Sequence, residues 1–188
     1  MRNSEGLNKE EITKAVYKRG YELEQRYYGC AQSVILALQD YFPLNSILVK
    51  AATSFTGGIA SSIEGPCGPL SAGVIVLSYF FGRSQEEYSN IALLRRPGPL
   101  VRVYWDRFSE RYEGDTCRKV QTHHFGKAYH FLDPEEYLAY EEAGGHLEKC
   151  ADVVGQSAAW LAEILIDNKI PFRSDKLFTD RQNREEQL

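Results

Sequence analysis

The chain has 188 residues, of which 43% are hydrophobic and 26% are charged, and its formal net charge at pH 7 is -4. A chain of this length and composition is expected to fold as one domain around its own hydrophobic core. Charges of both signs are spread along the sequence, so no basic surface for nucleic acid is expected. These numbers exclude a disordered protein and give no indication of a nucleic-acid partner.

Neither the first residues nor the longest apolar run predicts a membrane or secretory segment. The opening stretch MRNSEGLNKEEITKA is polar and lacks the apolar region of a signal peptide. The run AGVIVLSYFFG is too short to span a bilayer. A cytoplasmic location without stable membrane insertion is therefore expected. In that compartment four cysteines favour metal binding or redox chemistry over permanent disulfides.

Hydrophobic periodicity predicts an all-α fold, a single-domain bundle of about six to eight helices. The domain is expected to cover residues 1–170, followed by a polar tail over 171–188. In the first half of the chain, the expected helices are 9–27, 30–42, 46–55 and 66–81. Pro43 ends the second of these, and Gly57-Gly58 permits a reversal after the third.

The second half of the chain continues the helical pattern, without strand alternation or repeats. Helices are expected over residues 84–96, from Pro99 to about 112, from GDTC at 114–117 onward, over 133–143, and from about His146 to Asp167. Residues 122–145 are expected to be an elaboration of the domain.

The four cysteines are placed near expected helix starts. These residues are Cys30, Cys67, Cys117 and Cys150. Unpaired N–H groups and the helix dipole favour a thiolate there, so Cys30 or Cys67 is expected to alkylate faster than Cys150 at pH 6 to 7. Burial of these thiols would act in the opposite direction, because desolvation raises a thiol pKa. Glu64 opposes this effect at Cys67 unless a cation intervenes. For each cysteine taken alone, core packing is the favoured interpretation, because free cysteine is among the most buried residue types.

Four stretches carry a resemblance to a known family. They are GCAQSVILAL, TSFTGGIASSIEGPCGPLSAGVIVLS, DTCRKV and EKCADVV. Over roughly residues 10–165, the chain resembles the redox-active protein family named for its C-GCAxxG-C-C cysteine pattern. The resemblance implies a helical protein with a redox or metal-binding role, and related domains are associated with iron–sulfur centres. One departure is Ala72, which stands where the pattern has glycine, with Gly73 one place late.

Three interpretations of the cysteines follow. The leading one joins Cys30, Cys67, Cys117 and Cys150 in one site that holds an iron–sulfur cluster, or another thiolate–metal centre such as zinc, for electron transfer or redox sensing. The alternative is a metal-free thiol–disulfide oxidoreductase, in which one of these cysteines attacks and another resolves. The third is a helical interaction protein with structural core cysteines. Whether the protein is an enzyme, which redox protein is its partner, and whether it forms a homodimer stay open.

The histidines give a weaker signal than the cysteines. His123 and His124 would point about 100° apart on a helix, so they cannot share one site easily, although one of them could bind a metal beside Cys117. Surface or helix-capping roles are favoured for both, and also for His130 and His146. The sequence contains no G-x-S-x-G, P-loop, Rossmann or H-E-x-x-H motif.

Overall fold

The structure, a computed structural model, describes residues 8–172 and is all-α, as the sequence predicts. The described part contains eight α-helices and no β-strand. The helices are α1 (Lys9–Tyr27), α2 (Cys30–Gln39), α3 (Ile47–Ala51), α4 (Gly68–Phe81), α5 (Gly98–Tyr112), α6 (Cys117–Phe125), α7 (Pro134–Glu142) and α8 (Cys150–Asp167). Most of the tail expected over 171–188 lies outside the described residues.

Side-chain caps explain why several helices begin where they do. Asn8 and Glu11 form a reciprocal capping box at the start of α1. The Thr116 side chain accepts a hydrogen bond from the Lys119 N–H at the start of α6. Asp133 caps α7 in the same way. These caps use backbone N–H groups that would otherwise lack a partner, and each is visible in the sequence.

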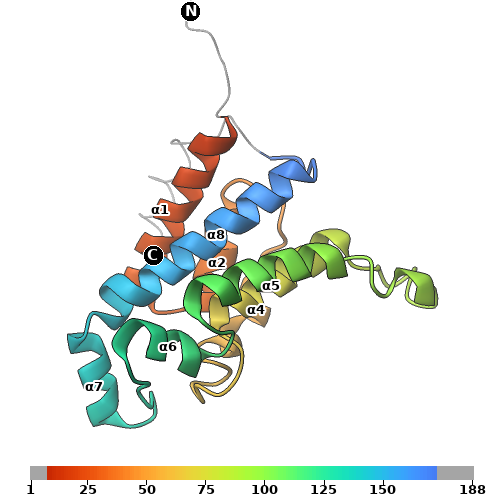
Figure 1. Cartoon of the computed structure of the whole chain (residues 1–188). Helices are drawn as coiled ribbons and strands as arrows, with labels where there is room; N and C mark the ends of the chain where they lie inside the picture. Colours follow the sequence, from red (N-terminus) through yellow and green to blue (C-terminus); the bar gives the residue numbers. More distant parts are fainter. Residues whose placement is uncertain (1–7, 173–188) are drawn as a thin grey trace, which may run out of the picture.

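The two long helices α1 and α8 lie side by side, as Figure 1 shows in red and blue. Their contact depends on Gly20 and Gly155. A Cβ atom added to Gly155 would lie 2.8 Å from the Tyr17 carbonyl oxygen, so a larger residue would push the helices apart. The core they share with α2 and α4 is apolar, and its burial supplies the main favourable term in folding.

Helix α4 is the most apolar helix and is largely buried. A Cβ atom on Gly73 would lie 2.1 Å from the Tyr104 ring, and the Tyr104 hydroxyl donates a hydrogen bond to the Pro69 carbonyl (2.9 Å). Gly73 therefore admits a tyrosine of α5, and Ala72 beside it is fully buried. No helix in the described part has the length and apolarity needed to cross a membrane.

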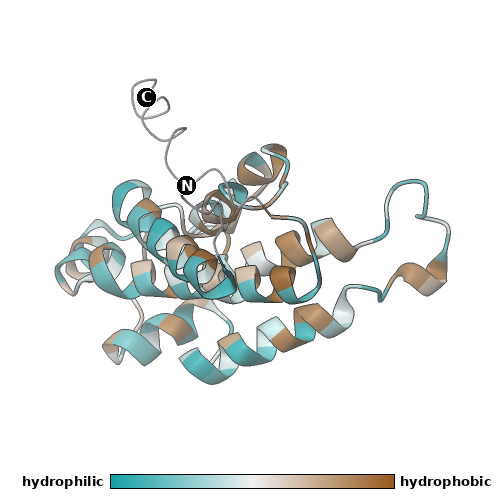
Figure 2. Ribbon diagram, turned by 90° about the horizontal axis from the view of Figure 1, so that it is seen from above, coloured by the Kyte–Doolittle hydropathy of each residue, from teal (hydrophilic) through white to brown (hydrophobic). Residues whose placement is uncertain are grey.

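The prediction of a helix over residues 84–96 is wrong. The segment forms only a short 3₁₀ turn, Ile91–Leu93, and projects away from the other helices (Figures 1 and 2). The Ile91 side chain is 79% exposed, so the apolar positions of this segment have no core against which to pack. Short helices depend on such packing for most of their stability. Instead, Arg96 holds the base of the segment by donating to the Phe81 and Gly82 carbonyls.

Other expected boundaries differ by a few residues. Helix α2 ends at Gln39 rather than 42, and α3 is shorter than 46–55 because its end becomes a 3₁₀ turn, Thr53–Phe55. Helix α4 begins at Gly68 rather than 66, which makes Cys67 its N-cap. A π-helical turn, Gly145–Lys149, precedes α8. Its effect is that Cys150 becomes the first residue of α8.

Candidate functional site

The four cysteines line one cavity of about 200 Å³. Cys30, Cys117 and Cys150 are the first residues of α2, α6 and α8, and Cys67 is the N-cap of α4. The site therefore lies where the N-terminal ends of four helices meet. All four cysteines are free; Cys67 and Cys117 are buried, and Cys30 and Cys150 are partly exposed.

Backbone pairing brings two of the cysteines together across a long stretch of sequence. The segments ahead of α4 and α6 meet in a single antiparallel bridge. The Cys67 N–H donates to the Asp115 carbonyl (2.8 Å), and the Cys117 N–H donates to the Gly65 carbonyl (3.0 Å). Each cysteine backbone is thus held by the segment that carries the other one.

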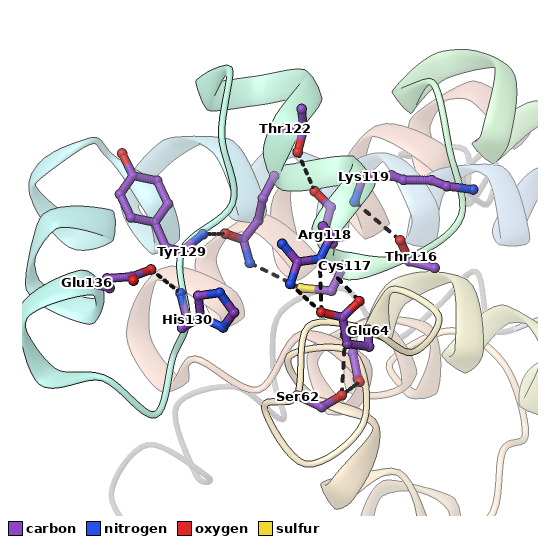
Figure 3. Close-up of polar contacts among 12 residues, drawn as sticks. Ser62, Glu64, Thr116, Cys117, Arg118, Lys119, Thr122, Tyr129, His130 and Glu136 are labelled. Carbon is purple, nitrogen blue, oxygen red and sulfur yellow. Dashed lines mark hydrogen bonds and ion pairs between the residues drawn. The ribbon is translucent and has the colours of Figure 1, made fainter.

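A surface ion pair also links the segment that precedes α4 to α6. Figure 3 shows the Arg118 guanidinium bonded to the Glu64 carboxylate. Arg118 lowers the pKa of Glu64, chiefly by this hydrogen bond. Glu64 was considered above as a charge that could disfavour a thiolate at Cys67, and Arg118 is the cation that intervenes.

One wall of the cavity is a left-handed turn. Residues 57–61 all have positive φ, between 50° and 71°. Consecutive non-glycine residues in this region are costly, roughly 1–2 kcal/mol each. A Cβ atom on Gly58 would lie 2.7 Å from the Cys117 Cβ, so glycine is required there. The Gly57 N–H bonds to the Cys30 sulfur and acts to lower its pKa. The turn is held in a strained conformation that directs the Gly57 N–H at the site.

A second part of the cavity wall is aromatic. It is formed by Tyr28, Phe131, Tyr137, Tyr140 and His146. The Tyr28 and His146 rings stack with centroids 4.4 Å apart, and Tyr140 meets Phe131 edge-on at 4.9 Å. Three of the five belong to residues 122–145, so the segment expected as an elaboration supplies most of this wall.

The aromatic wall corrects the sequence interpretation of the histidines. His146 is buried in the cavity wall and contacts the Glu141 carboxylate through Nδ1, so the surface or capping role expected for it is wrong. His123 and His124 do not line the cavity and instead pack against the Tyr112 ring. Burial lowers the pKa of His124 to about 4, so it is neutral at pH 7.

A buried carboxyl group, Glu24, also lines the cavity and was missed in the sequence. The residue is 1% exposed, and its Oε2 accepts a hydrogen bond from the Ser33 hydroxyl (3.2 Å). Burial raises its pKa to about 8. The signal was present in the sequence, because Glu24 continues the four-residue spacing of Ile12, Val16 and Gly20 on the buried face of α1.

The prediction of a lowered pKa for the thiols at the helix starts is wrong. Burial raises the pKa of all four thiols, that of Cys117 to about 11. For Cys67 the charges of the other three cysteines add to this effect. Desolvation disfavours the thiolate more than the helix termini favour it. The metal-free site therefore holds neutral thiols at pH 7.

Thiol labelling can check this conclusion. In reduced, metal-free protein at pH 7, we expect all four cysteines to react with iodoacetamide more slowly than in the urea-unfolded chain, because a neutral buried thiol is a poor nucleophile. Rates at each cysteine can be followed by mass spectrometry across a pH series. Labelling of Cys30 or Cys67 at pH 6 to 7 as fast as in the unfolded chain would contradict the effect of burial.

The ligand chemistry of the cavity suits a soft metal centre, since four sulfur atoms border one space. Within residues 8–172, however, no three His, Cys, Asp or Glu side chains form a ready ligand set for one metal ion.

The fold and the cavity define a helical protein with a four-cysteine site at the meeting point of its helix ends. Residues 28–164 match the family described as "Putative redox-active protein (C_GCAxxG_C_C)", and the chain belongs to this family. The resemblance seen in the sequence is thereby confirmed. No curated protein and no solved structure matches the chain.

Proposed function

We propose that this protein carries one iron–sulfur or other thiolate–metal centre on Cys30, Cys67, Cys117 and Cys150, and uses it for electron transfer or redox sensing. The observation that carries the proposal is the position of all four cysteines around one cavity. Four cysteine thiolates are the complete protein ligand set of the common iron–sulfur clusters. The family's redox description agrees with this use of the cysteines.

The shape of the site favours a cluster over a single zinc ion. Sulfur atoms that share one tetrahedral Zn²⁺ lie only about 3.8 Å apart, given Zn–S bonds of about 2.3 Å. The described His, Cys, Asp and Glu side chains offer no three-membered set of that kind. Cys30, Cys67, Cys117 and Cys150 border a cavity of about 200 Å³ and would together hold a cluster of several metal ions.

The surroundings of the cysteines supply what such a centre needs. When bound, a cluster supplies reversible one-electron chemistry. The chain holds the sulfurs at four helix starts, excludes most water and donates backbone hydrogen bonds from Gly57 and Ala31 to Cys30. We expect a reducing compartment such as the cytoplasm, because oxidation to disulfides would remove ligands.

The alternative, metal-free thiol–disulfide exchange, has less support. That chemistry starts from a thiolate, whereas burial raises the pKa of every cysteine here. The third interpretation, ordinary core cysteines, does not account for four thiols around one cavity.

Purification without oxygen tests the proposal. We expect a coloured protein whose visible absorption bleaches on reduction, with iron and acid-labile sulfide in the sample and little zinc. Colourless protein without metal, after attempted reconstitution with iron and sulfide, would overturn the proposal. If that protein cycled between dithiol and disulfide, the alternative would replace it.

A further inference from the structure

We propose that Gln121 and Tyr140 are positioning residues of the cysteine site, which donate hydrogen bonds to the sulfurs of Cys117 and Cys150 and thereby favour the reduced state of the centre. The inference rests on the proposed function and extends it beyond the four cysteines. It assigns a role to the stretch from α6 to α7.

The orientation of the Gln121 amide is fixed by its surroundings. The residue is 1% exposed, and its Oε1 accepts a hydrogen bond from the Tyr129 N–H (2.7 Å). Only the carbonyl end of an amide can accept from an N–H group, so the NH₂ end must point the other way. It points at the Cys117 sulfur, with an Nε2–Sγ distance of 3.4 Å. Figure 3 shows Cys117 and Tyr129 at the two ends of this link.

The Tyr140 hydroxyl is fixed as firmly, on the other side of the cavity. It lies 2.9 Å from the Cys150 sulfur. Its fully buried ring packs against Phe131 and His146, with centroids 4.9 and 5.0 Å away. A Cβ atom on Gly145 would lie 2.3 Å from the ring, so the chain leaves space for this tyrosine in this position. The hydroxyl cannot turn to solvent without repacking the wall.

The two donors act on only part of the site. Among the hydrogen bonds of the described residues, none from a side chain reaches the Cys67 sulfur, and Cys67 makes no side-chain cap on α4. Among the described residues, side-chain donors therefore reach the sulfurs of Cys117 and Cys150, whereas the donors to Cys30 come from the backbone. Such asymmetry is expected of a site tuned by its protein, since hydrogen bonds to sulfur are a main control of cluster potential.

The direction of the effect follows from charge. Adding an electron increases the negative charge on the sulfur ligands, and a hydrogen-bond donor stabilises that added charge. Loss of one donor should therefore disfavour the reduced form. We expect about a tenfold change in the equilibrium between the two states, which is about 59 mV for a one-electron couple.

The main experiment uses Tyr140→Phe and Gln121→Met, which keep side-chain size and remove the donor. Gln121→Met also removes the Oε1 atom that accepts from the Tyr129 N–H, so its folded stability is measured in parallel. Reduction potentials of the anaerobic holoproteins are measured by spectroelectrochemistry, alongside their metal content. Each variant should retain metal and show a more negative potential. The matched controls are Tyr112→Phe, a buried tyrosine whose hydroxyl has no hydrogen-bond partner among the described residues, and Gln39→Met, whose amide donates to the Leu44 carbonyl. Neither control should change the potential.

A second measurement reads the same hydrogen bonds without metal. In reduced, metal-free protein, Raman spectra report the S–H stretching bands, and Cys117→Ser and Cys150→Ser assign them. Tyr140→Phe should shift only the Cys150 band, and Gln121→Met only the Cys117 band. Wild-type protein without metal would overturn the proposed function but not these shifts. Unchanged bands, or unchanged potentials in variants with full metal content, would overturn the role of Gln121 and Tyr140.

Discussion

Serine in place of Cys30, Cys67 or Cys150 should remove most of the metal that the protein carries. Each substitution removes one of four thiolates and leaves a hydroxyl that binds soft metals poorly. The loss of affinity should exceed the roughly 10–100-fold that removal of an outer-shell partner causes. Metal analysis and visible spectra of the anaerobically purified variants measure the effect. Cys117→Ser should behave in the same way.

The cavity offers a control for this series. Ser61 lines the cavity without a thiol, so Ser61→Ala should keep its metal. Unchanged metal content in every cysteine variant would eliminate the metal centre. A different pattern, in which one cysteine is dispensable and another is essential for reduction of a disulfide substrate, would indicate thiol exchange.

The helices could be predicted because their signals are local. The apolar spacing in α1 and the caps at Asn8, Thr116 and Asp133 depend on residues within a few positions of each other. The failed helix over 84–96 shows the limit of this reasoning. Its composition suits a helix, but the structure gives it no surface on which to pack.

Only part of the cysteine site could be predicted from the sequence, for a related reason. Four cysteines near helix starts can be located in a sequence, but the burial of those starts depends on the packing of distant helices. Burial then reversed the expected pKa shift of Cys30 and Cys67. The roles of Tyr140 and His146 could not be predicted either, because buried aromatic residues usually belong to the core and only the tertiary fold places these two in the cavity wall.

Glu24→Gln should stabilise the metal-free protein at neutral pH. Burial raises the pKa of Glu24 to about 8 in the folded state, against 4.5 for an ordinary glutamate. Between these values the unfolded chain ionises while the folded protein keeps its proton, so stability falls as pH rises from about 4.5 to 8. At pH 7 the raised pKa of Glu24 therefore lowers the free energy of unfolding by roughly 3 kcal/mol, at 1.36 kcal/mol per pKa unit.

The gain from Glu24→Gln should therefore be roughly 3 kcal/mol at pH 7 and close to zero at pH 4, where both states hold the proton. Urea unfolding of reduced, metal-free protein across this pH range measures it. Glu22→Gln, an exposed position on the same helix, is the control and should stay within about 0.5 kcal/mol of wild type throughout. An effect of Glu24→Gln that does not grow with pH would show that this carboxyl group ionises normally, and that water reaches it through the cavity.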